Sequence, residues 1–243
     1  MPPDAPARVP AVAVLRRAPG FVASTLAIAR KDALIELRSR SVILSALAFA
    51  VLAITIFFFA WDPTAVASID LAPGVLWVIF TFSGLLGLHR SFGVEQPTRA
   101  MDALLAAPVD REAIYLGKLI ANLAFVVLVQ AISLPAVALL YNVPIGGYVW
   151  PLIGVVLMAS VGLVAVGTLF SSMAVSTRLA ELLLPLLALP FFVPVILPAA
   201  QATARLMNGR AASEVSGYLS ILGAFDVVFL VVCTLLYPYT LEQ

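Results

Sequence analysis

Six apolar segments of membrane-spanning length limit the fold of this chain more than any other feature. A helix needs roughly 20 apolar residues to cross the hydrocarbon core of a bilayer, and only helices satisfy their own backbone hydrogen bonds there. The sequence therefore predicts an all-α integral membrane protein with six transmembrane helices. The predicted spans are Val42–Ala60, Leu71–Leu88, Ala113–Leu140, Val149–Phe170, Leu179–Ala200 and Gly217–Pro238.

The composition agrees with this fold class and excludes several functions. The chain is 63% hydrophobic and 11% charged, whereas soluble domains carry about 25% charged residues. The single cysteine, Cys233, and the single histidine, His89, cannot form a disulfide or a metal site. The sequence has no phosphate-binding loop of the G-x-x-x-x-G-K-[ST] type and no basic run suited to nucleic acid. We therefore expect no catalysis by this chain and no directly bound cofactor, metal or haem ligand.

The distribution of positive charge predicts the orientation. Seven of the fourteen Lys and Arg residues precede the first span, four lie in residues 90–118, and Arg178 precedes the fifth helix. Only Arg205 and Arg210 fall on the other side. Because Lys and Arg are enriched in cytoplasmic loops, both termini and the 90–118 loop are predicted to be cytosolic.

The N-terminal region divides into two predicted parts before the membrane domain. Residues 1–20 are rich in proline, which removes amide donors, and they are expected to be disordered. Residues 21–41 form either an interfacial cytosolic helix or a charged lead-in to the first span. Residues 42–240 are then the six-helix permease domain. The apolar stripe of the predicted interfacial helix consists of Val22, Leu26, Ala29, Ala33 and Leu37.

Residues 90–118 form the main charged interval between spans. A short helical pattern within it ends at Pro108, and Asp110 is a plausible N-cap for the next span. The loop is therefore expected to be an ordered helix and turn. Because the chain has no phosphate-binding loop, we expect a separate ATPase to dock here. The residues assigned to this coupling loop are Arg90, Glu95, Arg99, Met101, Asp102, Leu104, Leu105, Pro108 and Arg111.

Two polar residues lie deep inside predicted spans. Asp226 is near the middle of the sixth span and Gln130 lies in the third. A carboxylate inside a membrane is costly and suggests a function by default. Asp226 is either a polar group between packed helices, protonated or hydrogen-bonded to a hydroxyl or amide such as Thr168 or Gln130, or a substrate or proton contact in a translocation path.

Proline and small residues predict two further features. The fifth span contains Pro185, Pro190, Pro194 and Pro198, and each interior proline removes a helical hydrogen bond. We expect this span to be bent, or broken near its outer end, with residues 199–216 either re-entrant or an ordinary loop. Small residues in the second and fourth spans predict close helix packing, within the chain or across a dimer.

Several stretches in order resemble one family of transporter permeases. The stretches are Leu71-Ala-Pro-Gly-Val-Leu-Trp77, Leu88-His-Arg-Ser-Phe92, Met101-Asp-Ala-Leu-Leu-Ala-Ala-Pro108, Leu184-Pro-Leu-Leu-Ala-Leu-Pro-Phe-Phe-Val-Pro-Val-Ile-Leu197 and Gly217-Tyr-Leu-Ser-Ile-Leu-Gly-Ala224. Together they are similar to sequences of the CcmB family of cytochrome c maturation permeases. The resemblance runs from about residue 21 onwards. It departs from the family pattern at Glu95, where an acidic cluster is reduced to one charge, and at Asp226.

The resemblance implies an ABC-2-type permease in the bacterial inner membrane. Its expected partners are an ABC ATPase subunit, other cytochrome c maturation membrane subunits and a periplasmic haem chaperone. ATP hydrolysis by the partner would drive haem export or release of the haem-loaded chaperone, and a homodimer is left open. The alternatives are an ABC-2 permease that exports a lipid, glycan or drug, and a membrane scaffold that transports nothing.

Overall fold

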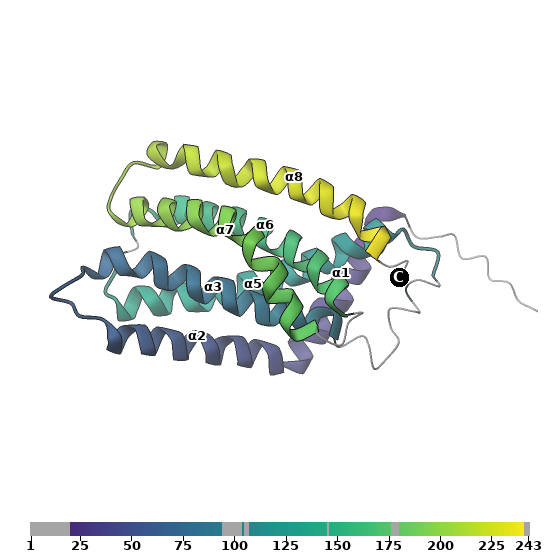
Figure 1. The fold of residues 1–243 in the computed structure, drawn as a ribbon, viewed down its shortest axis with the longest axis horizontal. Coiled ribbons are helices and arrows are strands. Elements are labelled where there is room, and N and C mark those ends of the chain that lie inside the picture. Colours follow the sequence, from purple (N-terminus) through teal and green to yellow (C-terminus); the bar gives the residue numbers. More distant parts are fainter. Residues whose placement is uncertain (1–19, 94–103, 105–106, 145, 176–179, 241–243) are drawn as a thin grey trace, which may run out of the picture.

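The computed structural model describes residues 20–93, 104, 107–144, 146–175 and 180–240, and these residues form an all-helical bundle (Figure 1). Six of its helices are long and apolar enough to cross a membrane, so the predicted fold class is confirmed. The elements are α1 (Phe21–Ser39), α2 (Ser41–Ala60), α3 (Ser68–Gly93), α5 (Arg111–Leu140), α6 (Val149–Val175), α7 (Ala180–Met207), the 3-10 helix η1 (Ala212–Val215) and α8 (Ser216–Thr240).

We call the end of the bundle where α3 ends and α5 begins the loop end. The short helix α1 also lies there, as does the last turn of α8 (Figure 1). Arg40 separates α1 from α2 because it adopts a left-handed conformation with φ 53°, which an α-helix cannot continue through. The chain therefore turns at Arg40, and α1 packs against α5 rather than extending α2.

The helix α1 packs through a face beside its predicted apolar stripe. Ser24, Thr25, Ile28 and Ala29 are buried, and α1 approaches α5 at Gly117, where a Cβ would lie 2.8 Å from the Ile28 Cβ. Because α1 and α5 approach so closely, the contacting face of α1 is made mostly of small residues. The spacing of the large apolar residues in the sequence does not predict this face. The large apolar side chains of the stripe stay exposed, as an interfacial helix requires, while Ala33 is half-buried. The position of α1 at the membrane interface remains a prediction. The exposed members are Val22, Leu26 and Leu37.

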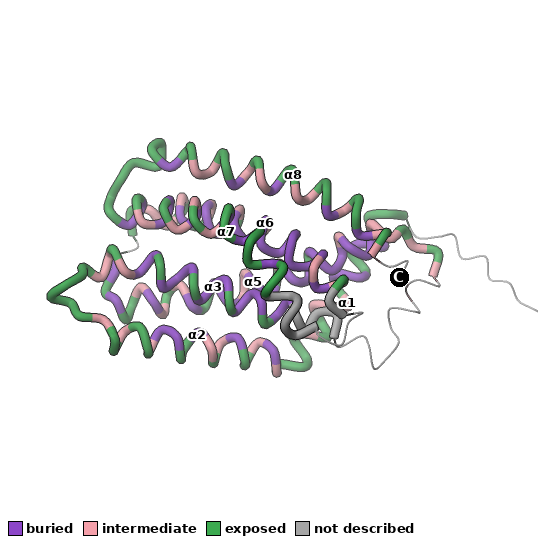
Figure 2. Tube along the Cα trace, in the orientation of Figure 1, coloured by how far each residue is buried: buried purple, intermediate pink, exposed green. Residues whose placement is uncertain are grey.

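The centre of the bundle consists of α3 and α6, which are mostly buried, whereas α8 is mostly exposed (Figure 2). Trp77 of α3 is buried, and its Nε1 donates to the Oγ1 of Thr203 on α7 at 3.1 Å. Close packing depends on glycine: a Cβ at Gly87 would lie 2.0 Å from the Phe125 ring, and one at Gly167 would lie 2.4 Å from Leu88. The small residues of α3 and α6 thus make contacts within the chain.

The fifth span was predicted to be bent, or broken near its outer end, and the structure has the bent helix. The helix α7 continues to Met207, seven residues beyond the expected end, and Figure 1 shows it bent. Three of its prolines, Pro190, Pro194 and Pro198, recur every four residues. The missing hydrogen bonds therefore lie on one side of the helix, which favours bending over breaking. Residues 199–207 belong to α7 and are not a re-entrant piece, and Gly209, with φ +73°, follows the end of the helix.

Candidate functional site

Four residues on one face of α5 contact the neighbouring helices at the loop end. Arg111, Tyr115, Lys118 and Asn122 follow one another at spacings of four, three and four residues. This spacing puts them along one stripe of a helix. Asp110 occupies the N-cap position with extended backbone, as predicted, although its side chain makes no capping hydrogen bond. The start of α5 therefore fixes where the stripe lies relative to the loop.

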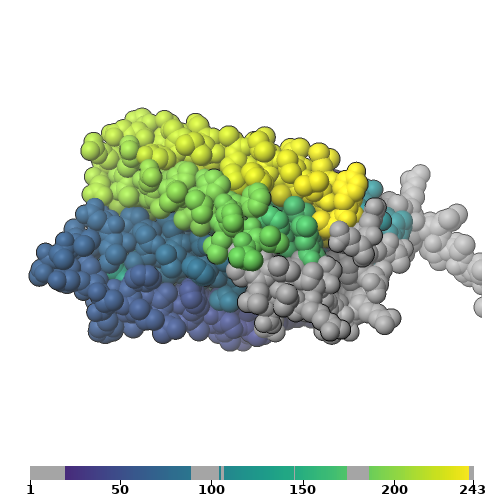
Figure 3. All heavy atoms as spheres, in the orientation of Figure 1, coloured from purple at the N-terminus to yellow at the C-terminus, as the bar shows by residue number. Residues whose placement is uncertain are grey.

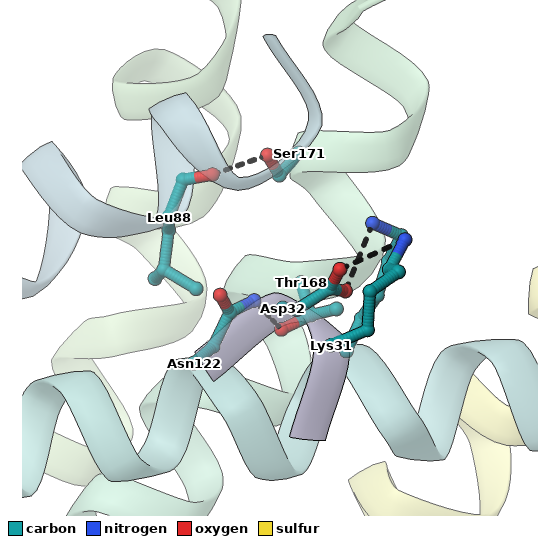
Figure 4. Close-up of polar contacts among 7 residues, drawn as sticks. Lys31, Asp32, Leu88, Asn122, Thr168 and Ser171 are labelled. Atoms are coloured by element: carbon teal, nitrogen blue, oxygen red, sulfur yellow. Dashed lines mark hydrogen bonds and ion pairs between the residues drawn. The ribbon is translucent and has the colours of Figure 1, made fainter. Parts of the chain in front are cut away.

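Lys118 connects α5 to α1 through a buried ion pair. Its side chain is fully buried, and its Nζ lies 3.4 Å from Oδ2 of Asp32. The other oxygen of Asp32, Oδ1, lies 3.0 Å from the Nζ of Lys31, whose side chain is 37% exposed. Figure 4 shows the Asp32 carboxylate with dashed lines to the two ammonium nitrogens. A buried charge without a partner costs several kcal/mol, so Asp32 holds α1 against α5.

Two hydrogen bonds connect α6 to the helices on either side of the loop. The Nδ2 of Asn122 donates to the Oγ1 of Thr168 at 3.0 Å, and the Oγ of Ser171 donates to the carbonyl of Leu88 at 2.6 Å (Figure 4). Asn122 belongs to α5 and Leu88 to α3. All these polar atoms are inside the bundle, where an unsatisfied group is costly. The bonds therefore fix both ends of the loop on α6.

The stripe also contacts α8 and a second position on α6. The Nη1 of Arg111 donates to the carbonyl of Pro238 at 3.3 Å, in the last turn of α8, where carbonyls lack intrahelical donors and favour a cation. The hydroxyl of Tyr115 donates to the carbonyl of Ala165 at 3.0 Å. The Tyr115 ring lies 5.3 Å from that of Tyr237. The start of α5 is thus in contact with α8 as well.

We call these contacting side chains the loop-end polar cluster. Its arrangement offers no nucleophile and base in contact, and its chemistry is that of a mechanical connection. A displacement of the loop at either end would move α1, α6 and α8 together. The cluster consists of Lys31, Asp32, Arg111, Tyr115, Lys118, Asn122, Thr168 and Ser171.

The structure places only some residues of the predicted coupling loop. The backbone of Arg90 lies in the last turn of α3. Leu104 is half-buried and packs against the apolar core, so its side chain seats the loop on the bundle. Pro108 is exposed in the bend before α5, and Arg111 belongs to the loop-end polar cluster. Glu95, Arg99, Met101, Asp102 and Leu105 lie outside the described residues.

The sequence prediction did not assign Lys118 and Asp32 to the site. Lys118 was the last residue of the predicted loop, and Asp32 was one of several charges in the helix before the first span. The four-three-four spacing from Arg111 to Asn122 is the signal that could have identified Lys118. No comparable signal identifies Asp32, because its partner lies 86 residues away along the chain.

The two predicted intramembrane residues lie apart from this cluster. The Oε1 of Gln130 accepts a hydrogen bond from the Oγ of Ser160 at 2.9 Å, which connects α5 to α6. The expected bonds from Asp226 to Thr168 or Gln130 are not formed. Thr168 pairs with Asn122 instead, and Asp226 packs beside Gly162. The sequence located these polar groups correctly, but the helix rotations that choose their partners follow from packing.

The fold is that of a multi-pass helical membrane protein, and several of its interhelical polar contacts lie beside the loop between α3 and α5. Residues 23–243 match the family described as CcmB protein, and the chain belongs to the CcmB family. The resemblance expected from the sequence motifs is thereby confirmed.

The similar curated proteins all carry the same name. The chain is 32% identical to heme exporter protein B of Paracoccus denitrificans over 185 residues, which cover 76% of this chain and 83% of the relative. It is 30% identical to heme exporter protein B of Rhodobacter capsulatus over 165 residues, covering 68% and 75%. For the Haemophilus influenzae protein of that name, the identity is 28% over 202 residues, covering 83% and 90%.

Proposed function

We propose that this chain is the membrane subunit of an ABC transporter complex for cytochrome c biogenesis. In this proposal a separate ATPase subunit hydrolyses ATP, and this chain transmits the resulting movement across the membrane. The movement drives haem export or the release of a haem-loaded periplasmic chaperone. The observation that carries the proposal is the family match over residues 23–243, because it spans all six helices rather than one motif.

The loop-end polar cluster supports the coupling role. An ATPase that docks on residues 90–118 would push on the end of α3 and the start of α5. Ser171 and Asn122 connect these two points to α6, while Lys118 connects α5 to α1. Interfaces of packed helices shift between discrete arrangements rather than deforming continuously. A push at the loop is therefore expected to move the bundle as a unit.

The partners and the location follow from the same proposal. The excess of Lys and Arg on the loop side supports a cytosolic position for the loop and both termini, where ATP is available. The membrane is then the bacterial inner membrane. The further partners are other cytochrome c maturation membrane subunits, a periplasmic haem chaperone at the opposite end, and a second copy of this chain if the permease dimerises. Haem is cargo here, and no residue of the chain is assigned as its ligand.

A gene deletion tests the maturation role. We expect the deletion to abolish covalent haem in c-type cytochromes, measured by haem staining of membrane proteins, and the wild-type gene to restore it. Normal holocytochrome levels in the deletion strain would remove the role and leave export of another substrate or scaffolding.

A loop variant tests the docking role separately. We expect Leu105→Asp to abolish co-purification of the ATPase subunit after mild solubilisation, with Leu105→Met as the matched control. Both variants should accumulate in the membrane at wild-type levels. ATPase that still co-purifies with Leu105→Asp would show that docking occurs elsewhere.

A further inference from the structure

Asp226 is a buried carboxyl group in the middle of α8. Its side chain is 8% exposed, and its Oδ1 has no hydrogen-bond partner among the residues that the structure describes. Ten residues separate Asp226 from the start of α8 at Ser216, which corresponds to roughly 15 Å along the helix. The group is therefore well inside the span, far from either end.

The carboxyl group occupies a space that a glycine leaves open on α6. A Cβ at Gly162 would lie 2.7 Å from Oδ1 of Asp226 and 3.0 Å from the Phe225 ring. Aromatic rings lie nearby: the rings of Phe225 and Phe229 stack with centroids 4.1 Å apart, and the ring centroid of Phe191 on α7 lies 6.0 Å from that of Phe229. The position thus fits a small neutral polar group, and the described residues provide no hydrogen-bond donor to Oδ1.

No charged group on the helices packed against α8 faces Asp226 among the described side chains. The helix α6 contains no Asp, Glu, Lys, Arg or His. On α7, Arg205 lies over the ring of Tyr218 at 5.0 Å, eight residues before Asp226 and so roughly 12 Å away along α8. Glu181 belongs to the first turn of α7 at the loop end.

The remaining charged groups are also at the two ends, and the nearest titratable group on α8 itself, Cys233, lies seven residues from Asp226, roughly 10 Å along the helix. Those of α5 are Arg111, Glu112, Tyr115 and Lys118, all in its first turns; Arg111 contacts Pro238, twelve residues after Asp226 and roughly 18 Å along α8. The 3-10 helix η1 contributes Glu214, which pairs with Arg210 at 3.8 Å. On α8 itself they are Tyr218, Cys233, Tyr237 and Tyr239.

A carboxylate in this position would be an uncompensated charge inside a membrane, which costs far more than one unsatisfied oxygen of a neutral acid. We propose that Asp226 is a proton-binding site: it carries a proton while α8 packs against α6 at Gly162, and loss of that proton loosens α8. The proposal is independent of the transported cargo.

The location of α8 gives this site a route to the rest of the molecule. The helix lies at the surface of the bundle beside α7 (Figure 3), so it can shift without disrupting the α3–α6 centre. Its last turn contacts Arg111 through Pro238 and Ser172 through Thr240, at 3.3 Å in each case. A change in the packing of α8 would therefore reach the loop-end polar cluster.

Carbodiimide labelling of the full chain in phospholipid nanodiscs tests the proton. Dicyclohexylcarbodiimide enters the membrane and adds to a protonated carboxyl: the acid proton moves to one nitrogen, the acid oxygen bonds the central carbon, and rearrangement gives a stable N-acylurea. We expect mass spectrometry to find this adduct on Asp226 at pH 6, and to find it decreasing as the pH rises. A water-soluble carbodiimide should instead label exposed acids such as Asp62 and Glu214. Asp226 labelled by the water-soluble reagent alone would overturn the proposal.

Thermal unfolding decides the matter if the apolar reagent fails to reach the site. Asp226→Asn replaces the neutral acid by a neutral side chain of the same shape, and its stability should not depend on the proton of this group. An unfolded aspartate is ionised above about pH 4, so a folded state that keeps the proton loses stability as the pH rises. From pH 6 to pH 9 the melting temperature of the wild type should therefore fall by at least about 3 °C relative to that of the variant. A variant that melts well below the wild type at both pH values would overturn the proposal, since it would show a paired, ionised Asp226.

Gly162→Ala tests the packing contact. Its Cβ would displace the carboxyl group, so we expect a lower melting temperature than that of Gly154→Ala, a matched change on α6 with nothing within 4 Å of the new Cβ. Equal melting temperatures for these two variants would contradict the contact between Asp226 and Gly162.

Discussion

Two carboxylates, Asp32 at the loop end and Asp226 in the middle of α8, are stabilised in opposite ways. The oxygens of Asp32 lie 3.0 Å and 3.4 Å from the ammonium groups of Lys31 and Lys118. Asp226 lies against a glycine and aromatic rings, and its Oδ1 has no partner in the described part of the chain. One site satisfies its charge by pairing, and the other is compatible with the bundle only without charge.

The contrast shows which polar groups define the architecture. Groups paired between helices fix how those helices pack, and breaking one pair leaves the other partner unsatisfied. A lone neutral acid fixes little, but its protonation can change. We therefore expect substitutions at the loop end to affect stability and coupling most, and neutral replacement of Asp226 to be tolerated at low pH.

The largest expected effect is at Asp32. Asp32→Asn removes the counter-charge that lies 3.4 Å from the buried Lys118 ammonium, and we expect the free energy of unfolding to fall by about 3–5 kcal/mol. Detergent-induced unfolding of the purified protein measures this. Adding Lys118→Met removes the buried ammonium as well, so the double variant should regain most of the loss. A single variant as stable as the wild type would show that the pair does not hold α1 on α5.

Next in size is the contact between α1 and α5 at Gly117. A Cβ there would lie 2.9 Å from the carbonyl oxygen of Thr25. This oxygen belongs to the backbone of α1, so it cannot move aside as a flexible side chain could. We expect Gly117→Ala to lower the free energy of unfolding by about 1–3 kcal/mol. The control is Gly74→Ala on α3, where the new Cβ meets nothing within 4 Å. If both variants behave alike, the helices are not as close as described.

A smaller effect is expected at the Asn122–Thr168 hydrogen bond. Polar pairs between membrane helices are coupled by about 0.6–1.7 kcal/mol. A double-mutant cycle with Asn122→Leu and Thr168→Val isolates this coupling, and we expect a value in that range. Strictly additive effects of the two changes would mean that the bond contributes nothing.

The smallest effect is predicted for Lys31. It contacts the same carboxylate as Lys118, but its side chain is 37% exposed, and water screens the pair. Lys31→Met should change the free energy of unfolding by no more than about 0.5 kcal/mol, measured beside Lys118→Met. If Lys31→Met lowered the free energy of unfolding as much as Lys118→Met, the exposed ammonium would contribute as much as the buried one, which would contradict this prediction.

The spans and the CcmB resemblance could be predicted from sequence because both depend on local pattern. Apolar length identified all six helices, and the end of α5 at Leu140 was predicted to the residue. The end of α7 was missed because proline spacing does not state whether a helix bends or breaks. The periodicity of α1 places Ile28 opposite the apolar stripe, on a side that could meet protein, but the small residues beside it follow from the close approach of Gly117 on a distant helix.

The site was predicted less completely for a related reason. The loop between α3 and α5 and the polar residues Asp226 and Gln130 stand out in an apolar sequence. The partners of these residues cannot be recognised in the sequence. Ser160, Gly162 and Thr168 all lie on α6, and the rotation and tilt of the helices determine which of them each polar residue contacts. The ion pair of Lys118 and Asp32 joins residues 86 positions apart, and one sequence contains no signal for such a pairing.

The most direct test of the account is the effect of the loop-end ion pair on cytochrome c maturation. The double variant Asp32→Asn with Lys118→Met removes both charges together, so it should fold, insert and co-purify with the ATPase subunit. We predict that covalent haem in c-type cytochromes nevertheless falls at least roughly tenfold, equivalent to about 1.4 kcal/mol of lost coupling, while Asp226→Asn stays near the wild-type level. Wild-type haem attachment in the double variant would contradict the claim that the loop-end polar cluster transmits the movement.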